Sequence, residues 1–383
     1  MRRFRIGVDA RPLSTPMSGV GRLIHETIRS FPNQSQYEFV LFSHKPVHQH
    51  HKSLLVLSNT YWVQGEWLFS SKGGVYFTVE LPFQIYKQGI DLFWGAQQVL
   101  PPGIRKTIPC VLGYMDMVLY LYPGTMRTLA RWQQRAYQKY SVDRADYIVS
   151  ISESTRKDVI KKFRYPLEKT SVAYPGIDPI LVESYLTKKI SPRIQSIPRP
   201  YILSVSTIEP RKNYRFLLEV FRLIRSSKSL PELHWVIAGR RGWEKPSFYR
   251  ELDSDRERFR DIFVLEDLDD SELHYLYRNS SLFWMASLYE GFGIPVVEAL
   301  YHRKMAILSD IQPFREIGKD SLEYLPASSR EDMQKWKNLS IQYILSGKSY
   351  NGDITSFTWE NSAKEYERIF QLLLSFNRNG STG

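Results

Sequence analysis

The sequence is poor in cysteine and has no long apolar run, and each absence excludes a class of protein. Cys110 is the one cysteine among 383 residues, so an internal disulfide framework is excluded and a reducing compartment is favoured. No apolar run reaches the roughly 18 residues that a membrane-spanning helix needs. The basic start, Met1 to Arg5, leads into a strand pattern and not into a signal peptide. We therefore expect a cytoplasmic protein without a membrane span.

Motifs for nucleic-acid binding are also missing, although the formal net charge is +12. Such a charge favours an anionic partner or substrate. The sequence contains no zinc finger, basic zipper or RNA-binding strand motif, so we expect no nucleic acid as a partner. Phosphate-bearing substrates, or an acidic membrane surface, would use the same excess charge.

The chain is too long for one hydrophobic core, because single cores seldom grow beyond about 250–300 residues. Short apolar runs alternate with helical patterns along its length, which predicts α/β architecture with parallel sheets. Residues 191–200 contain three prolines and separate two such alternations. We interpret them as a linker between a domain of residues 1–195 and a domain of residues 196–358.

The stretch from Leu288 to Ala299 has the features of an anion-binding turn. An apolar run, 282–286, predicts a buried strand, and Pro295 suits the first turn of a helix. Gly291 and Gly293 lie between them and let the backbone approach a ligand closely. Free N–H groups and the positive end of the helix dipole favour phosphate at this position.

Two carboxylates flank this turn, Glu290 before it and Glu298 in the helix after it. Each can accept hydrogen bonds from sugar hydroxyls, which suggests a sugar nucleotide as ligand. The stretch Glu-Gly-Phe-Gly-Ile-Pro-Val-Val-Glu resembles the Glu-x7-Glu signature of retaining GT-B glycosyltransferases, the GT4 family in particular. The resemblance implies that Glu298 holds the ribose and Glu290 the donor sugar. It also implies a donor site lined by Gly291, Phe292, Gly293 and Ile294.

A second basic motif follows the predicted strand 201–207. Its loop reads Glu-Pro-Arg-Lys-Asn, and ligands of open α/β sheets gather at the carboxyl ends of strands. Arg211 can contact two phosphate oxygens with its planar fork, while Lys212 acts as a compact charge. The loop resembles the diphosphate-binding loop of the GT4 family, which implies a catalytic role for both cations.

The first predicted strand, 5–9, is followed by Ser-Gly-Val-Gly-Arg, with Gly19 and Gly21. A dinucleotide fingerprint is a poor match, because Ile24 holds the third glycine position and no acidic ribose ligand ends the next strand. The segment resembles the GT4 loop that faces the donor phosphates or the acceptor. A flexible surface loop is the alternative, and a helix is expected over residues 23–31.

The predicted strand 109–114 ends in Met115 and Asp116. GT4 enzymes usually have His-Asp here, with the histidine beside the transferred sugar, so that histidine is absent. Asp116 remains and is predicted to hydrogen-bond an acceptor or sugar hydroxyl. Because Met115 takes the place of this histidine, a non-catalytic role stays open as the alternative, with the chain as a GT-B-fold partner or scaffold subunit.

Three further segments each have two interpretations. Half of the histidines lie in residues 44–51, where a zinc site is possible but a solvated loop is favoured. The aromatic segment 61–83 is either core or an acceptor surface. A stripe of Arg127, Arg131, Arg135 and Lys139 on a predicted helix is either a solvated face or a peripheral contact with anionic lipid at the inner face of the membrane.

Asp253-Ser-Asp255 matches a metal motif of the other large glycosyltransferase fold. It lies in a run of alternating charges, residues 249–261, which predicts an exposed helix with ion pairs. We therefore reject it as a metal site.

The resemblance covers nearly the whole chain and implies two Rossmann-like, doubly wound parallel-sheet domains facing across a donor cleft. A C-terminal helix at about 359–376 would cross back to the first domain. The implied activity is transfer of a hexose, with mannose favoured, from a GDP- or UDP-sugar to a glycan or lipid-linked saccharide, as in bacterial surface polysaccharide synthesis. No cofactor and no metal are expected.

Overall fold

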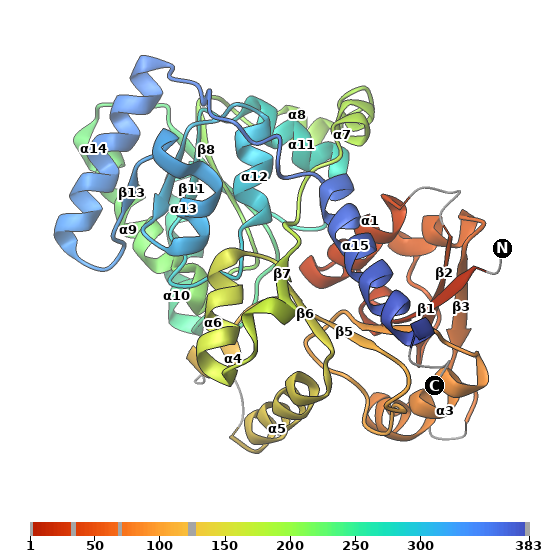
Figure 1. Cartoon of the computed structure of the whole chain (residues 1–383). Coiled ribbons are helices and arrows are strands. Elements are labelled where there is room, and N and C mark those ends of the chain that lie inside the picture. The colour runs from red at the N-terminus through yellow and green to blue at the C-terminus, as the bar shows by residue number, and fades with distance from the viewer. Residues whose placement is uncertain (1–2, 32–35, 68–70, 122–127, 380–383) are drawn as a thin grey trace. The chain divides into compact units, whose positions relative to one another are not determined.

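The computed structural model describes residues 3–31, 36–67, 71–121 and 128–379, with residues 128–133 and 376–379 given by their backbone alone. The chain divides into two compact units (Figure 1). The first comprises Met1–Pro175 with Thr358–Gly383, and the second comprises Gly176–Phe357.

The first unit is built on a parallel sheet with the strand order β3-β2-β1-β4-β5-β6-β7. Its strands are β1 (Phe4–Asp9), β2 (Tyr37–Ser43), β3 (Thr60–Gln64), β4 (Leu92–Gly95), β5 (Cys110–Tyr114), β6 (Tyr147–Ser150) and β7 (Thr170–Val172). Its α-helices are α1 (Gly19–Arg29), α2 (Gly73–Val75), α3 (Leu81–Lys87), α4 (Val118–Leu121), α5 (Thr128–Arg144), α6 (Glu153–Phe163) and α15 (Trp359–Asn379). Shorter helical turns are η1 (Arg11–Ser14), η2 (Gln49–Val56), η3 (Tyr76–Glu80) and η5 (Leu167–Lys169), of which η3 is a π-helix.

The second unit has a parallel sheet with the order β10-β9-β8-β11-β12-β13. Its strands are β8 (Tyr201–Val205), β9 (His234–Ala238), β10 (Ile262–Leu265), β11 (Leu282–Met285), β12 (Ala306–Ser309) and β13 (Tyr324–Leu325). Its helices are α7 (Pro179–Leu186), α8 (Pro192–Gln195), α9 (Tyr214–Ser227), α10 (Pro246–Phe259), α11 (Asp270–Asn279), α12 (Ile294–Tyr301), α13 (Gln312–Gly318) and α14 (Arg330–Ser346), with the 3₁₀ turns η6 (Pro210–Lys212) and η7 (Lys319–Ser321).

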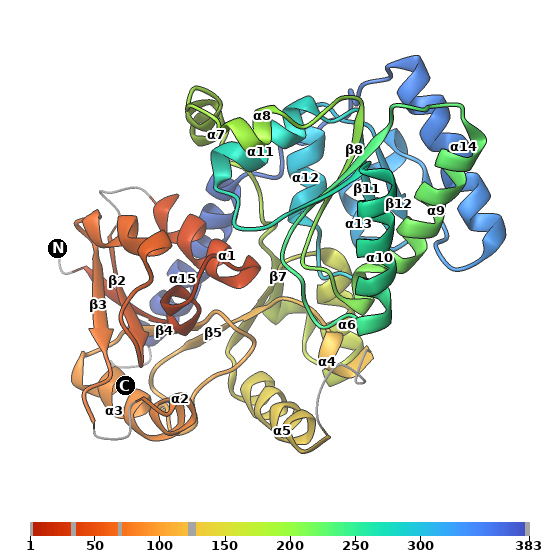
Figure 2. The same ribbon diagram turned by 180° about the vertical axis from the view of Figure 1, so that it is seen from behind.

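Both sheets are doubly wound. From β8 the chain continues to β9 and β10 on one side, and later strands extend the sheet from β11 on the other. Because βαβ crossovers are right-handed, this reversal places α9 and α10 on one face and α12 and α13 on the other, as Figures 1 and 2 show. Every residue of β11 is buried, as expected for a parallel strand covered on both faces. The predicted pair of Rossmann-like sheets is confirmed.

The division between the units lies earlier than the predicted boundary at residue 195. Helix α7 packs against α11, and Ser191 donates a hydrogen bond to the Glu272 carboxylate. Residues 191–200 therefore belong to the second unit and include α8, because local packing outweighs their proline-rich composition.

Helix α15 completes the first unit. The ring of Tyr366 lies 4.5 Å from that of Trp94, and Phe370 stacks 6.1 Å from Phe31 (centroid distances). These four side chains are buried, so the last helix supplies core that the first 175 residues lack.

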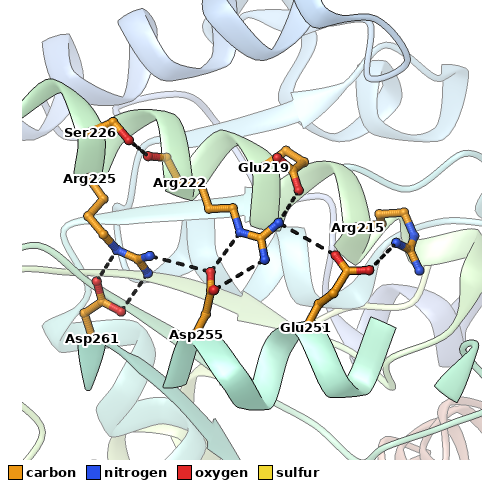
Figure 3. A network of polar contacts seen from close by, with 8 residues as sticks. All are labelled: Arg215, Glu219, Arg222, Arg225, Ser226, Glu251, Asp255 and Asp261. Carbon is orange, nitrogen blue, oxygen red and sulfur yellow. Dashed lines mark hydrogen bonds and ion pairs between the residues drawn. The ribbon is translucent and has the colours of Figure 1, made fainter. Parts of the chain in front are cut away.

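An ion-pair network joins α9 to α10 (Figure 3). The carboxylate of Asp255 accepts a 2.8 Å hydrogen bond from Arg222 Nε and lies 3.5 Å from Arg225 Nη1. Asp253 pairs with Arg241 and Arg256. The prediction of an ion-paired helix in this region is confirmed, and both aspartates of the apparent metal motif are bound by arginines.

Two sequence interpretations of the first unit change. The solvated loop expected over residues 44–51 extends only to His48, because residues 49–56 form η2. Within η2, the buried His51 ring places its Nδ1 3.1 Å from Nδ1 of His25. The aromatic segment proves to be divided, since Tyr76 and Phe77 are core whereas Trp67 and Phe83 are about half exposed.

Candidate active site

Two loops meet where the second sheet reverses direction. Strands β8 and β11 are parallel neighbours, with Leu282 opposite Ile202 and Phe283 opposite Leu203. Their carboxyl ends therefore lie at the same edge, and the chain leaves them in opposite directions. Such a switch point is where open α/β sheets bind ligands. The backbone N–H of Leu288 donates a 2.8 Å hydrogen bond to the carbonyl of Arg211 and joins the two loops.

Arg211 lies in η6 and reaches across to the second loop. Its Nη1 donates to the carbonyl of Tyr289 and to Glu290 Oε2, both at 2.7 Å. Its Nη2 donates to Glu209 Oε1 at 2.6 Å. The turn η6 begins with Pro210 and is followed by Asn213, which adopts a left-handed φ of 58° and anchors the loop by donating to the carbonyl of Ala327. The guanidinium is thus fixed on three sides.

Lys212 points to the same carboxylate. Its Nζ donates to Glu290 Oε1, which also accepts a 2.7 Å hydrogen bond from Ser287 Oγ. Burial by itself would raise the pKa of Glu290, but Lys212, Arg211 and these hydrogen bonds outweigh it and lower the pKa to about 2. Glu290 is therefore ionised at neutral pH.

The structure brings together Arg211, Lys212 and Glu290, which the sequence singled out. It adds Glu209 and Ser287, which sequence reasoning missed. Glu209 directly precedes Pro-Arg-Lys and Ser287 lies three residues before Glu290, so proximity to the motifs was the available signal. Two cations face two carboxylates in this cluster, and its charged side chains are 5–17% exposed.

The glycine turn before α12 has the backbone that its sequence predicts. Gly293 has a φ of 132°, and a Cβ there would lie 2.9 Å from a ring carbon of Phe314. Helix α12 begins at Ile294, with Pro295 in its first turn and no side chain capping its N-terminus. Phe292 is buried with its ring 5.6 Å from that of Phe357, so only backbone groups of Phe292 are suited to meet a ligand. Anion binding here stays a prediction.

Glu298 lies one turn into α12 and is 4% exposed. Its Oε2 accepts a 2.8 Å hydrogen bond from the hydroxyl of Tyr277 on α11. Four residues after Glu298, His302 Nε2 lies 2.9 Å from His274 Nδ1, and burial lowers the pKa of His302 to about 3. Glu298 is thus held in part by the contact between α11 and α12. Its predicted role toward ribose is untested.

The sequence-predicted residues of the first unit lie at two helix starts. Gly19 and Gly21 form the first turn of α1, capped by Ser18 Oγ accepting from the N–H of Gly21 at 3.1 Å. The helix thus begins before residue 23, because Ser18 is its cap, and the glycines are not in a flexible loop. Asp116 Oδ1 accepts from the N–H of Val118 at the start of α4, and Met115 is buried.

A polar group at the switch point of the first sheet was missed. Asp9 ends β1, is fully buried, and accepts from Arg11 Nε at 2.9 Å and from Gln97 Nε2 at 2.7 Å. Strands β1 and β4 are parallel neighbours at the reversal of this sheet. An acidic residue at the end of the first strand, followed by arginine, was the signal. The described residues include no group of three or more His, Cys, Asp or Glu that could hold a metal ion.

Comparison with known proteins gives the family. Residues 17–180 match the model described as Glycosyltransferase Family 4, and residues 188–350 match that of Glycosyl transferases group 1. The chain is 27% identical to O-antigen chain mannosyltransferase B of Escherichia coli over 74% of each protein. It is 24% identical to O-antigen chain mannosyltransferase RfbU of Salmonella typhimurium, over 70% of this chain and 74% of that protein. Among solved structures, HepE of Anabaena in complex with UDP matches with a TM-score of 0.63 at 14% identity, over 98% of this chain and 100% of that one.

The two Rossmann-like sheets and the matched structures define the GT-B fold of glycosyltransferases. The two family models together span most of the sequence. The chain belongs to the GT4-type glycosyltransferases, and the predicted family, fold and enzyme class are confirmed.

Proposed function

We propose that this glycosyltransferase transfers a hexose, with mannose favoured, from a GDP- or UDP-sugar to a hydroxyl of a glycan or lipid-linked saccharide, with retention of configuration. The relatives from E. coli and S. typhimurium carry the name O-antigen chain mannosyltransferase, and HepE was solved with UDP. The names of the relatives support mannose as the transferred sugar and a role in bacterial surface polysaccharide or lipopolysaccharide synthesis. The UDP complex of HepE supports a nucleotide-sugar donor.

The Arg211–Lys212–Glu290 cluster is the observation that carries the proposal. When the glycosidic bond of the donor loosens, negative charge grows on the departing diphosphate. Arg211 and Lys212, with backbone amides near Gly293, would stabilise that charge. Glu290 and Glu209 already hold Arg211 in place by hydrogen bonds of 2.7 and 2.6 Å, and Glu290 also accepts from Lys212. A preorganised site of this kind needs no rearrangement when the charge appears.

Glu290 combines this positioning role with its predicted contact to the donor sugar. A carboxylate offers about four acceptor positions, and Arg211, Lys212 and Ser287 occupy three of them. The remaining position is proposed to accept a sugar hydroxyl. Glu298 is proposed to accept from the ribose, and Asp116 from an acceptor or sugar hydroxyl.

Metal independence is part of the proposal, because the two cations would neutralise the diphosphate in place of a divalent ion. Transfer is expected to proceed in EDTA at the rate measured without chelator. Loss of activity in EDTA, restored by Mg²⁺ or Mn²⁺, would contradict this part.

A donor panel tests the function. The full chain is incubated with GDP-mannose, UDP-glucose and related donors and with membrane-extracted lipid-linked acceptors, and products are read by mass spectrometry. A mass increase of one hexose with one donor is expected. Calorimetric binding of a donor without any product would favour the non-catalytic partner or scaffold role, to which Met115 at the usual histidine position points.

The proposal includes a peripheral contact of the protein with the inner face of a membrane. Of the predicted basic stripe, Arg127 and the side chain of Arg131 lie outside the described residues. Arg135 donates to the carbonyl of Leu119 at 3.2 Å, and Lys139 pairs with Asp143. The two described side chains of the stripe, Arg135 and Lys139, thus already have partners within the first unit. Among the described residues, no helix combines the length and apolar character needed to cross a bilayer.

A further inference from the structure

One stretch of the first unit exposes an unusual number of large apolar side chains. Elements α2, η3 and α3 follow one another without a break from Gly73 to Lys87. Val75, Val79, Phe83 and Tyr86 recur along this run at helical spacing and are 40–54% exposed. Trp67, 46% exposed, places its ring 5.7 Å from that of Phe83. We name these five side chains the apolar face.

The opposite side of the same run is core. Tyr76, Leu81 and Ile85 are at most 1% exposed. The run is therefore amphipathic and fixed by its inner side, so exposure of the apolar face is not a consequence of loose packing. Figures 1 and 2 both show α3 at the margin of the first unit.

A buried carboxylate holds Trp67 on this face. Glu80, 1% exposed, lies on the inner side of η3, and its Oε1 accepts a 2.7 Å hydrogen bond from the N–H of Glu66 and one of 2.9 Å from Gln84 Nε2. The N–H of Trp67 lies 3.4 Å from the same oxygen. Burial costs this carboxyl group its hydration, and its hydrogen bonds fix the backbone that presents the tryptophan.

The surroundings of the apolar face are mainly basic. Lys72 and Lys87 are exposed at the two ends of the run, and Arg105 lies 3.6 Å above the ring of Tyr86. Lys106 is also exposed, whereas Glu66 is the exposed acidic residue beside Trp67. Helix α5 is a neighbour, since the rings of Tyr137 and Phe77 lie 6.2 Å apart. Apolar and aromatic side chains within a basic rim complement an anionic lipid surface.

We propose that the apolar face inserts into the interfacial layer of an anionic membrane, with Lys72, Lys87 and Arg105 against lipid headgroups. Trp, Tyr and Phe suit this layer because one end of the ring system is apolar and the other tolerates water. This inference rests on the proposed function in one respect. A lipid-linked acceptor would be presented at the membrane surface that the apolar face contacts.

Vesicle co-sedimentation of the full chain tests the proposal. Vesicles of phosphatidylethanolamine with phosphatidylglycerol are compared with vesicles of phosphatidylcholine. Wild type is expected to bind the anionic vesicles more tightly, and Val79→Asp with Phe83→Asp to weaken that binding by about tenfold or more. Lys72→Glu with Lys87→Glu should weaken binding to anionic vesicles and leave binding to phosphatidylcholine unchanged.

The matched control is Ile180→Asp with Leu345→Asp, which changes two side chains of the second unit that are 85% and 67% exposed. It should bind vesicles as wild type does. Transfer to a water-soluble acceptor should be unchanged in the apolar-face variant, so failure of membrane binding and failure of the enzymatic proposal are distinguishable. Equal binding by wild type and the apolar-face variant would overturn the proposal. So would self-association of wild type that the variant abolishes, because the face would then join two copies of the chain.

Discussion

Glu290 accepts hydrogen bonds from three residues at once, Arg211, Lys212 and Ser287. Breaking a buried ion pair by removing one partner typically costs about 3–5 kcal/mol, because the other charge stays buried without compensation. At Glu290 two cations would each lose a partner, although Arg211 would keep Glu209. We therefore expect this position to control both the stability of the second unit and the placement of Arg211.

The first prediction concerns Glu290→Gln and pH. The pKa of Glu290 is lowered from its ordinary 4.5 to about 2, so the folded state favours the ionised form. The resulting stabilisation, about 3 kcal/mol from a shift of this size, is complete above about pH 4.5 and is lost as the pH falls toward 2. Urea unfolding should show a gap between wild type and variant that narrows over this range. The exposed Glu360→Gln is the control, and a gap independent of pH would contradict the assignment.

The second prediction compares two glycines with positive φ. Gly293→Ala must place its Cβ 2.9 Å from the Phe314 ring at a φ of 132°. Gly347→Ala has a φ of 60° and nothing within 4 Å of the added Cβ. The second change should cost about 1 kcal/mol and the first about 2–3 kcal/mol or more. Similar unfolding free energies for the two variants would show that the turn before α12 can relax.

At the residue scale, the sequence singled out Arg211, Lys212 and Glu290 but not Glu209, which also pairs with Arg211. Arg211 and Lys212 were singled out because their loop follows a predicted strand and resembles the diphosphate-binding loop of the GT4 family. Glu209 was not, although it pairs with Arg211 only two residues away. The Asp9–Arg11–Gln97 group was not, because it depends on which strands are neighbours at the sheet reversal. That order is a tertiary property, and Gln97 is distant from Asp9 in sequence.

At the scale of elements, ion pairs away from the candidate site join helix α9 to helix α10. In Figure 3, Arg222 and Arg225 of α9 point toward Asp255 of α10, and Arg225 also reaches Asp261, 2.6 Å from its Nε. Exposed single pairs contribute about 0–1 kcal/mol, whereas shared, partly buried networks contribute more. The side chain of Asp255 is 13% exposed.

The third prediction is that Asp255→Asn destabilises the chain by about 1–2 kcal/mol, since two arginines lose a shared partner. Asp143→Asn is the matched control, because it removes a single pair whose side chains are 58–59% exposed. The control should change stability by less than about 0.5 kcal/mol. Chemical denaturation in low and high salt measures both, and an equal effect of the two changes would contradict a role for the network.

Element positions were largely predictable, and the exceptions have physical causes. Buried strands such as β8 and β11 are continuous apolar runs and were located to within two residues. The edge strands β3, β7 and β13 were missed, because each is short or lacks a continuous buried pattern. Helix α1 was started too late, since its first turn holds two glycines and depends on the Ser18 cap.

At the scale of the whole molecule, the division into two units follows packing and not composition. Residues 176–195 were assigned to the first domain because the proline-rich stretch 191–200 was interpreted as the linker, whereas contacts place them in the second unit. The return of α15 to the first unit was expected only from the family resemblance. Its sequence is amphipathic, but nothing local to it specifies Trp94 and Phe31 as neighbours.

The central claim is that basic side chains at the β8–β11 switch point stabilise a departing diphosphate without a metal ion. Turnover of Arg211→Ala in the presence of EDTA, with the donor identified by the panel, tests it most directly, and Arg368→Ala on α15 is the control. We predict that Arg211→Ala lowers turnover by about 10²–10³ while wild type and control stay active. Unchanged turnover in a correctly folded Arg211→Ala variant would contradict the claim.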